Sequence, residues 1–356
     1  MSVTSTTPQA TTAPPHPRRP RLKSRSYARA ARDLRRELGR ELPQDELKRL
    51  HRRDPVRHFA IVARQFLLLG VCIAISAMTT HWWLWIPAAV LQGFTVFNFT
   101  VLLHEQVHNA IFSRRRPRPN AFLGWLYAFP SGISSSQFFR WHTDHHENLG
   151  SDVEDPKRAH LSPKKHTRWY KALYMTPALF PIYFRAAKQE TATYEPALQR
   201  RIAIERSLTI VGHLAIAASL VVFGGWALAA RVYFVPYFLV FPVAFTLNRL
   251  GQHYRIDPDD PREWSTRVDG NAFWHFVFLY SNFHLEHHYF QSVPFYNLPA
   301  LNRLLRPYFE KHGIENHGYG EILWDWFVRN RTPHQDWDLE AETSARPPAT
   351  TAAWSG

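Results

Sequence analysis

Histidine clusters carry the most specific chemical signal in this sequence. The stretch F-H-L-E-H-H-Y-F places His284, His287 and His288 at positions i, i+3 and i+4. On a helix those positions share one face, so three imidazoles can converge on one point. Two further clusters precede it: W-H-T-D-H-H with His142, His145 and His146, and H-E-Q-V-H with His104 and His108. Three related clusters in one chain predict a shared metal site.

Apolar runs between the clusters predict that the chain crosses a membrane. Four such runs carry almost no charge: Phe59–Thr80, Leu84–Leu103, Leu208–Trp226 and Val232–Leu247. Roughly 20 apolar residues suffice to cross a bilayer as a helix. The fourth run is shorter, and Pro236 and Pro242 are expected to kink it. Short links join the runs in pairs, so we expect an all-α integral membrane protein with four transmembrane helices in two hairpins.

The charge distribution predicts the orientation in the membrane. An even number of spans puts both termini, residues 109–206 and the segment after Arg249 on one side. These segments are strongly basic, whereas the links on the other side carry only Arg231. By the positive-inside rule, the basic side is cytoplasmic. The clustered histidines, together with His253 just after the fourth run, are then expected on a cytoplasmic helical cap.

Nine imidazoles on one side of a membrane suit two transition-metal ions better than one, because a single zinc ion usually takes four ligands. Imidazole binds Fe, Zn, Cu and Ni, but a redox function favours iron because zinc has no redox chemistry. Nearby carboxylates are expected either to accept the outer ring N–H groups of the ligands or to be solvated surface residues. They are Glu105, Asp144, Asp152, Asp155 and Glu286.

Composition narrows the functional classes. The net charge of +14 would suit nucleic-acid binding, but much of it lies in the N-terminal segment and in Arg114–Arg118, beside apolar runs. That placement follows the positive-inside rule, so we expect no nucleic-acid partner. The single cysteine, Cys72, excludes disulfides within the chain, a Cys-based zinc ribbon and an iron–sulfur cluster carried on this polypeptide.

The chain divides into three parts. Residues 1–24 and 340–356 are rich in Pro, Thr and Ala and are predicted to be disordered tails. Residues 25–339 form the predicted membrane domain between them. At its start, residues 26–54 alternate Arg, Leu and Glu at near-helical spacing, which predicts an amphipathic helix.

These residues resemble the membrane fatty acid desaturase and hydroxylase superfamily. Its pattern is H-x(3-4)-H, then H-x(2-3)-H-H, then H/Q-x(2-3)-H-H, with membrane hairpins around the boxes. Here the boxes are His104–His108, His142–His146 and His284–His288, and the match runs roughly from Phe59 to Arg306. Gln252-His253-Tyr254 resembles the extra histidine ligand that follows the fourth span in this family. The resemblance implies a non-haem centre of two Fe ions that uses O₂ and two electrons to attack an unactivated C–H bond.

The resemblance also implies partners. The third box begins with His284 rather than Gln, and the sequence contains no His-Pro-Gly-Gly haem motif. Both features argue against a front-end desaturase with a fused haem domain, so electrons must come from an external donor of ferredoxin, rubredoxin or cytochrome type. The other expected partners are the membrane and a lipid or acyl substrate.

Three functions fit these observations. The first is a desaturase that introduces a double bond into a fatty-acyl lipid or thioester. The second is a hydroxylase or ketolase of the same superfamily, with a carotenoid, sphingolipid or alkane as substrate. The boxes do not separate these two, because the outcome depends on fine geometry at the metals. The third is a non-catalytic membrane metal-binding protein, which predicts polar residues along the spans; the spans here lack them.

Overall fold

The computed structural model describes residues 24–151, 154–163, 165–257 and 260–331. Every regular element within these ranges is helical, which confirms the predicted all-α class. Both predicted tails lie outside the described ranges except for Ser24, where the first helix begins.

Three helices are long and apolar: α3 (Pro55–Met78), α4 (Trp82–Val107) and α9 (Pro196–Ala229). Helix α9 continues directly into the π-helical η3 (Ala230–Val240) and then into α10 (Phe241–His253). The shorter α-helices are α1 (Ser24–Glu41), α2 (Gln44–Leu50), α5 (Pro117–Ala128), α6 (Ser135–Glu147), α7 (Arg168–Ala172), α8 (Leu179–Thr191), α11 (Ala272–Val277), α12 (His284–Tyr289), α13 (Leu298–His312) and α14 (Tyr319–Leu323). The remaining short helical segments are η1 (Lys157–Leu161), η2 (Leu173–Met175), η4 (Pro261–Glu263), η5 (Phe295–Asn297) and η6 (Trp324–Val328).

The first two apolar runs form the helices α3 and α4, which pack against each other and are joined by Thr79–His81. Helix α3 begins where the Asp54 side chain accepts a hydrogen bond from the backbone N–H of Arg57 at 3.0 Å. Pro55 occupies the first helical turn, where its missing N–H has no cost. Both helices are long and apolar enough to cross a membrane.

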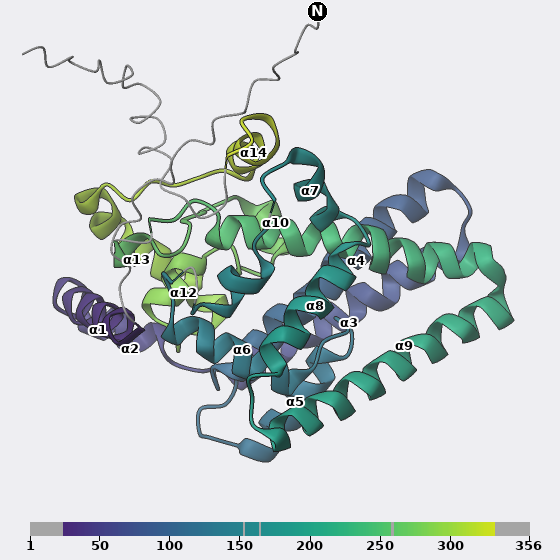
Figure 1. The fold of residues 1–356 in the computed structure, drawn as a ribbon, viewed down its shortest axis with the longest axis horizontal. Helices are drawn as coiled ribbons and strands as arrows, with labels where there is room; N and C mark the ends of the chain where they lie inside the picture. The colour runs from purple at the N-terminus through teal and green to yellow at the C-terminus, as the bar shows by residue number, and fades with distance from the viewer. Residues whose placement is uncertain (1–23, 152–153, 164, 258–259, 332–356) are drawn as a thin grey trace, which may run out of the picture.

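The third candidate span, Pro196–His253, joins both of the remaining predicted runs into one helical stretch of 58 residues. A straight helix of that length would extend about 87 Å, nearly three times a bilayer core of about 30 Å. The chain instead bends at Gly225, whose φ of 75° and ψ of 168° suit glycine alone. Figure 1 shows α9 and α10 leading away from their common end. The described residues thus contain three candidate membrane-spanning helices, whereas the sequence predicts four. The third and fourth predicted spans count as one because helical structure resumes directly after the bend.

The long helices differ in the surface that they expose. Helix α4 is mostly buried among its neighbours, and Phe99, Leu102 and Leu103 are completely covered. Helix α9 instead exposes large apolar side chains, including Val222 and Phe223. An exposed apolar surface on a membrane helix faces lipid. Helix α4 is therefore central, whereas α9 lies at the periphery.

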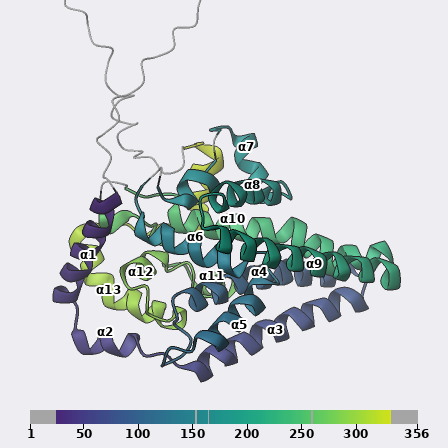
Figure 2. The same ribbon diagram turned by 60° about the horizontal axis from the view of Figure 1, so that its bottom comes forward.

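The shorter helices α1, α12 and α13 gather at one end of the long helices (Figure 2). Leu34 and Leu38 of α1 are buried in the main hydrophobic core. Glu37 on the same helix accepts a hydrogen bond from the Tyr308 hydroxyl of α13 at 2.9 Å. The amphipathic segment predicted for residues 26–54 is therefore helical, but Pro43 divides it into α1 and α2.

Gly93 marks the closest approach of α4 to η3. A Cβ atom at this position would lie 2.5 Å from Val240 Cβ and 2.8 Å from the Pro236 carbonyl oxygen. We predict that Gly93→Ala destabilises the protein by about 1–3 kcal/mol, because the backbone of η3 must move. Thermal unfolding in detergent micelles measures this as a lower midpoint. Gly70→Ala on α3 is the matched control, because nothing lies within 4 Å of its added methyl group. Equal midpoints for the two variants would contradict this packing.

Candidate metal centre

Four helices bring the nine predicted histidines together. Helix α4 ends with His104 in its last turn and His108 at its C-cap, and His253 is the last residue of α10. Helix α6 carries His142, His145 and His146, and α12 carries His284, His287 and His288. Ser134 caps the N-terminus of α6, and its hydroxyl accepts a hydrogen bond from the backbone N–H of Gln137 at 3.1 Å.

The nine histidines form two groups, within each of which one ring nitrogen per residue lies within 4.8 Å of all the others. The first group is His104, His108, His142, His146 and His287; the second is His145, His253, His284 and His288. Each triplet is therefore divided between the groups. Helix α6 contributes its i and i+4 histidines to the first group and its i+3 histidine, His145, to the second. Helix α12 contributes its i and i+4 histidines to the second group and its i+3 histidine, His287, to the first.

The distances between ring nitrogens match shared metal ligation. His142 Nε2 lies 2.8 Å from Nε2 of both His108 and His146, and His284 Nε2 lies 3.0 Å from Nε2 of both His253 and His288. A neutral ring nitrogen carries one hydrogen or one lone pair, so it cannot make two good hydrogen bonds to other ring nitrogens. Two nitrogens bound to one ion at right angles, each about 2.1 Å from it, lie about 3 Å apart.

Two buried ring nitrogens support the same conclusion. Nε2 of His104 and Nε2 of His145 have no hydrogen-bond partner among the described residues. A buried polar atom without a hydrogen-bond partner costs free energy. One of these atoms belongs to each group, where a metal ion would satisfy it. Both groups can therefore bind a metal ion.

Burial keeps the histidines neutral, which is the form that binds metal. Loss of solvation lowers the pKa of His108 to about 3, with a further contribution from the positive charge of Lys157. The pKa values of the α6 and α12 histidines lie well below the usual value, and for each of them loss of solvation is the largest cause. No proton has to be removed from these rings at neutral pH before an ion binds.

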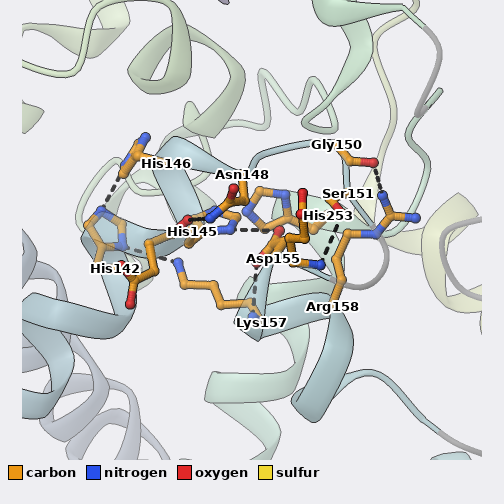
Figure 3. Close-up of polar contacts among 12 residues, drawn as sticks. His142, His145, His146, Asn148, Gly150, Ser151, Asp155, Lys157, Arg158 and His253 are labelled. Atoms are coloured by element: carbon orange, nitrogen blue, oxygen red, sulfur yellow. Dashed lines mark hydrogen bonds and ion pairs between the residues drawn. The ribbon is translucent and has the colours of Figure 1, made fainter. Parts of the chain in front are cut away.

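Asp155 contacts one histidine of the second group. Its Oδ2 lies 2.8 Å from Nδ1 of His145, and both side chains are completely buried (Figure 3). A carboxylate that accepts the Nδ1–H leaves the lone pair of Nε2 free for a metal ion. Asp155 therefore lies where it could hold the His145 ring in one orientation, and it comes from the loop after α6 rather than from a histidine box.

Two outer contacts have no signal in the sequence. The Lys157 Nζ atom lies 3.1 Å from His142 Nδ1, and the Gln291 amide nitrogen lies 2.8 Å from His146 Nδ1. Burial lowers the pKa of Lys157 to about 7, and the neutral amine can accept the His142 Nδ1–H. Neither residue belongs to a spaced motif, and only the fold brings them to the histidines.

The other predicted carboxylates have their own partners. Glu105 Oε2 accepts a hydrogen bond from a backbone N–H at 3.1 Å, and its Oε1 lies 3.8 Å from His104 Nδ1, beyond hydrogen-bond range. Asp144 pairs with Arg140 at 3.0 Å, and Glu286 accepts from the Asn302 amide. Asp152 lies outside the described residues. Asp155 therefore lies within hydrogen-bond distance of His145, whereas Glu105 is too far from His104 for a hydrogen bond.

An apolar cavity ends at the histidines. It lies between α4, α6, α8 and α10, and its aromatic walls include Phe97, Phe138, Phe180, Phe241 and Phe245. His104, His142, His284 and His287 line it as well. A mostly apolar cavity with a few convergent polar groups is typical of a site for an apolar ligand. Such a ligand would lie directly beside both histidine groups.

Comparison with known proteins assigns the family. The sequence model for the fatty acid desaturase family matches residues 80–320. The chain is 25% identical over 295 residues to the sphingolipid delta(4)-desaturase/C4-monooxygenase of Homo sapiens, covering 79% of this chain and 83% of that protein. It is 24% identical over 296 residues to the sphingolipid delta(4)-desaturase of Drosophila melanogaster, covering 80% and 84%. Identity to the acyl-lipid 8-desaturase of Rebecca salina is 25% over 247 residues, covering 60% and 55%.

The matched region contains all three histidine boxes, the four helices that carry them and the cavity between them. The chain therefore belongs to the fatty acid desaturase family and is an oxidoreductase that acts on lipids.

Proposed function

We propose that this protein is an O₂-dependent di-iron desaturase that introduces a double bond into the hydrocarbon chain of a lipid. The observation that carries the proposal is the apolar cavity that ends at both histidine groups. The names of the similar proteins favour a sphingolipid as the substrate class. The phenylalanine-lined cavity is the feature expected of a lipid-converting enzyme rather than of a non-catalytic metal carrier.

The two histidine groups would hold two iron ions, and the nitrogen ligands are suitable for iron. When bound, the ions would supply the O₂ chemistry needed to oxidise an unactivated C–H bond. Loss of hydrogen from two adjacent carbons, with O₂, two electrons and two protons, gives one double bond and two waters.

The protein itself contributes positioning. The aromatic walls hold the hydrocarbon chain beside the histidines and exclude water, which protects the reactive centre from side reactions. Asp155 holds His145 in the tautomer that presents Nε2. Each turnover consumes two electrons that the side chains cannot replenish by themselves, so the electrons must come from an external donor, and we expect a ferredoxin, rubredoxin or cytochrome type.

A hydroxylase is the second candidate. Several similar proteins carry names that combine desaturase and C4-monooxygenase. The same O₂, electrons and protons then yield one alcohol and one water, and the products distinguish the two reactions.

Lipid analysis tests the reaction. Cells that express the chain should accumulate lipids with one additional double bond, detected by mass spectrometry. His142→Ala and His284→Ala each remove one ligand from a different group, so we predict that either change abolishes the new lipid without preventing membrane insertion. New hydroxyl groups in place of double bonds would favour the second candidate. Unchanged lipids in cells whose protein is loaded with iron would contradict both.

Removal of the carboxylate that orients His145 should weaken metal binding. For Asp155→Asn we predict an iron affinity about 10- to 100-fold lower, because a neutral amide is a weaker acceptor for the His145 Nδ1–H than a carboxylate is. Elemental analysis after dialysis against a chelator measures this. Asp144→Asn is the matched control, since Asp144 lies on α6 but pairs with Arg140. The prediction fails if both variants retain the two irons per chain expected of the parent protein.

We also propose that the bend at Gly225 divides the third candidate span into two crossings, so that four crossings place the histidines and both termini on the cytoplasmic side. A membrane-impermeant maleimide should label Met78→Cys in intact cells, and Arg303→Cys only after the membrane is broken. Both positions are exposed, and the parent protein is the unlabelled control because its Cys72 is buried. The reverse labelling pattern would refute the orientation.

A further inference from the structure

The face of α10 that lines the cavity changes from apolar to polar along the helix. Phe241 and Phe245 come first, and Asn248, Arg249 and Gln252 follow them toward His253 at the end of the helix. These positions share one helical face because they are spaced by three or four residues. The cavity is therefore hydrocarbon-like along most of its length and becomes polar next to the histidines.

Arg249 is the cationic member of this polar end. One of its guanidinium nitrogens donates to the Lys157 carbonyl oxygen at 2.6 Å. Its other N–H groups have no hydrogen-bond partner among the described residues, and the side chain is partly exposed to the cavity. A guanidinium offers five donors in a rigid plane, and a charge this deep in a protein is costly unless it is hydrogen-bonded. Its unused donors are available to a ligand.

The neighbouring amides do not compete for those donors. Asn248 donates to the Ser281 hydroxyl at 2.7 Å, and Gln252 donates to the Ser281 carbonyl oxygen at 3.3 Å. Both side chains are thus held against the wall, and Arg249 stays oriented toward the space between α10 and η1.

We infer that Arg249 positions the substrate by donating hydrogen bonds to an oxygen atom at the polar end of the lipid, close to the carbon that reacts. Arg249 lies four positions before His253, which is about 6 Å along the helix. The reacting carbon then lies only a few bonds from the polar group, and the tail extends along the phenylalanines. The inference rests on the proposed function. It adds the position along the lipid at which oxidation takes place.

Two substrate pairs test the inference and identify the oxygen. The first is N-acyl sphinganine and its 3-deoxy analogue, which lacks a hydroxyl. The second is an ester phosphatidylcholine and the matching ether lipid, which lacks a carbonyl. Feeding each pair in equal amounts to cells gives the ratio of kcat/KM directly from the products, independent of the electron donor and of the enzyme level.

The parent protein should prefer the oxygen-bearing member of one pair by about tenfold to a hundredfold, since hydrogen bonds to charged groups are worth that much. In Arg249→Met the preference should fall to about one, and the double bond should spread to neighbouring carbons. A merely structural role would lower the conversion of both members equally and leave the ratio unchanged. Arg201→Met, at an exposed arginine on α9, is the matched control and should keep the preference.

A binding measurement separates this inference from the proposed reaction. Purified full-length protein in lipid nanodiscs should unfold at a higher temperature with the oxygen-bearing lipid than with its analogue, and Arg249→Met should remove that difference. This holds even if no lipid is oxidised, in which case only the proposed function fails. If Arg249→Met discriminates within both pairs as the parent protein does, Arg249 does not position the substrate.

Discussion

Nine imidazoles buried beside a hydrocarbon-lined cavity impose the constraint on which the rest of the structure depends. Each ring must be neutral, must find a partner for both nitrogens and must come within a few ångströms of its neighbours although the helices are distant in sequence. Burial meets the first condition by depressing the pKa values. A bound ion would meet the second for His104 and His145, because hydrogen bonds alone leave Nε2 of each without a partner among the described residues.

The division of each triplet between the two groups ties the two centres together. Residues i and i+4 point to nearly the same side of a helix, whereas i+3 is rotated to the other side of that direction. Helices α6 and α12 use this difference in opposite ways, so both centres are built on the same two helices. Their separation is then set by helix geometry rather than by flexible loops, which suits a reaction that depends on fine geometry.

The membrane helices serve both the lipid and the metal. Helices α4 and α10 present phenylalanines to the cavity along their length and histidines at their ends. A shift of either helix would therefore move the tail-binding walls and the metal ligands together. The close packing at Gly93, where α4 meets η3, limits such a shift.

The sequence by itself determined the helical class, the apolar helices and all nine histidines, because periodicity and box spacing are local properties of the chain. It did not determine how the triplets divide, since that depends on the rotation of α6 against α12. Lys157, Gln291 and Arg249 likewise reach the site only through long-range packing, and no spacing rule identifies them. The hydropathy pattern predicted a break after Trp226, but it did not show that helical structure continues past the bend at Gly225, because hydropathy records apolar length and not backbone hydrogen bonding.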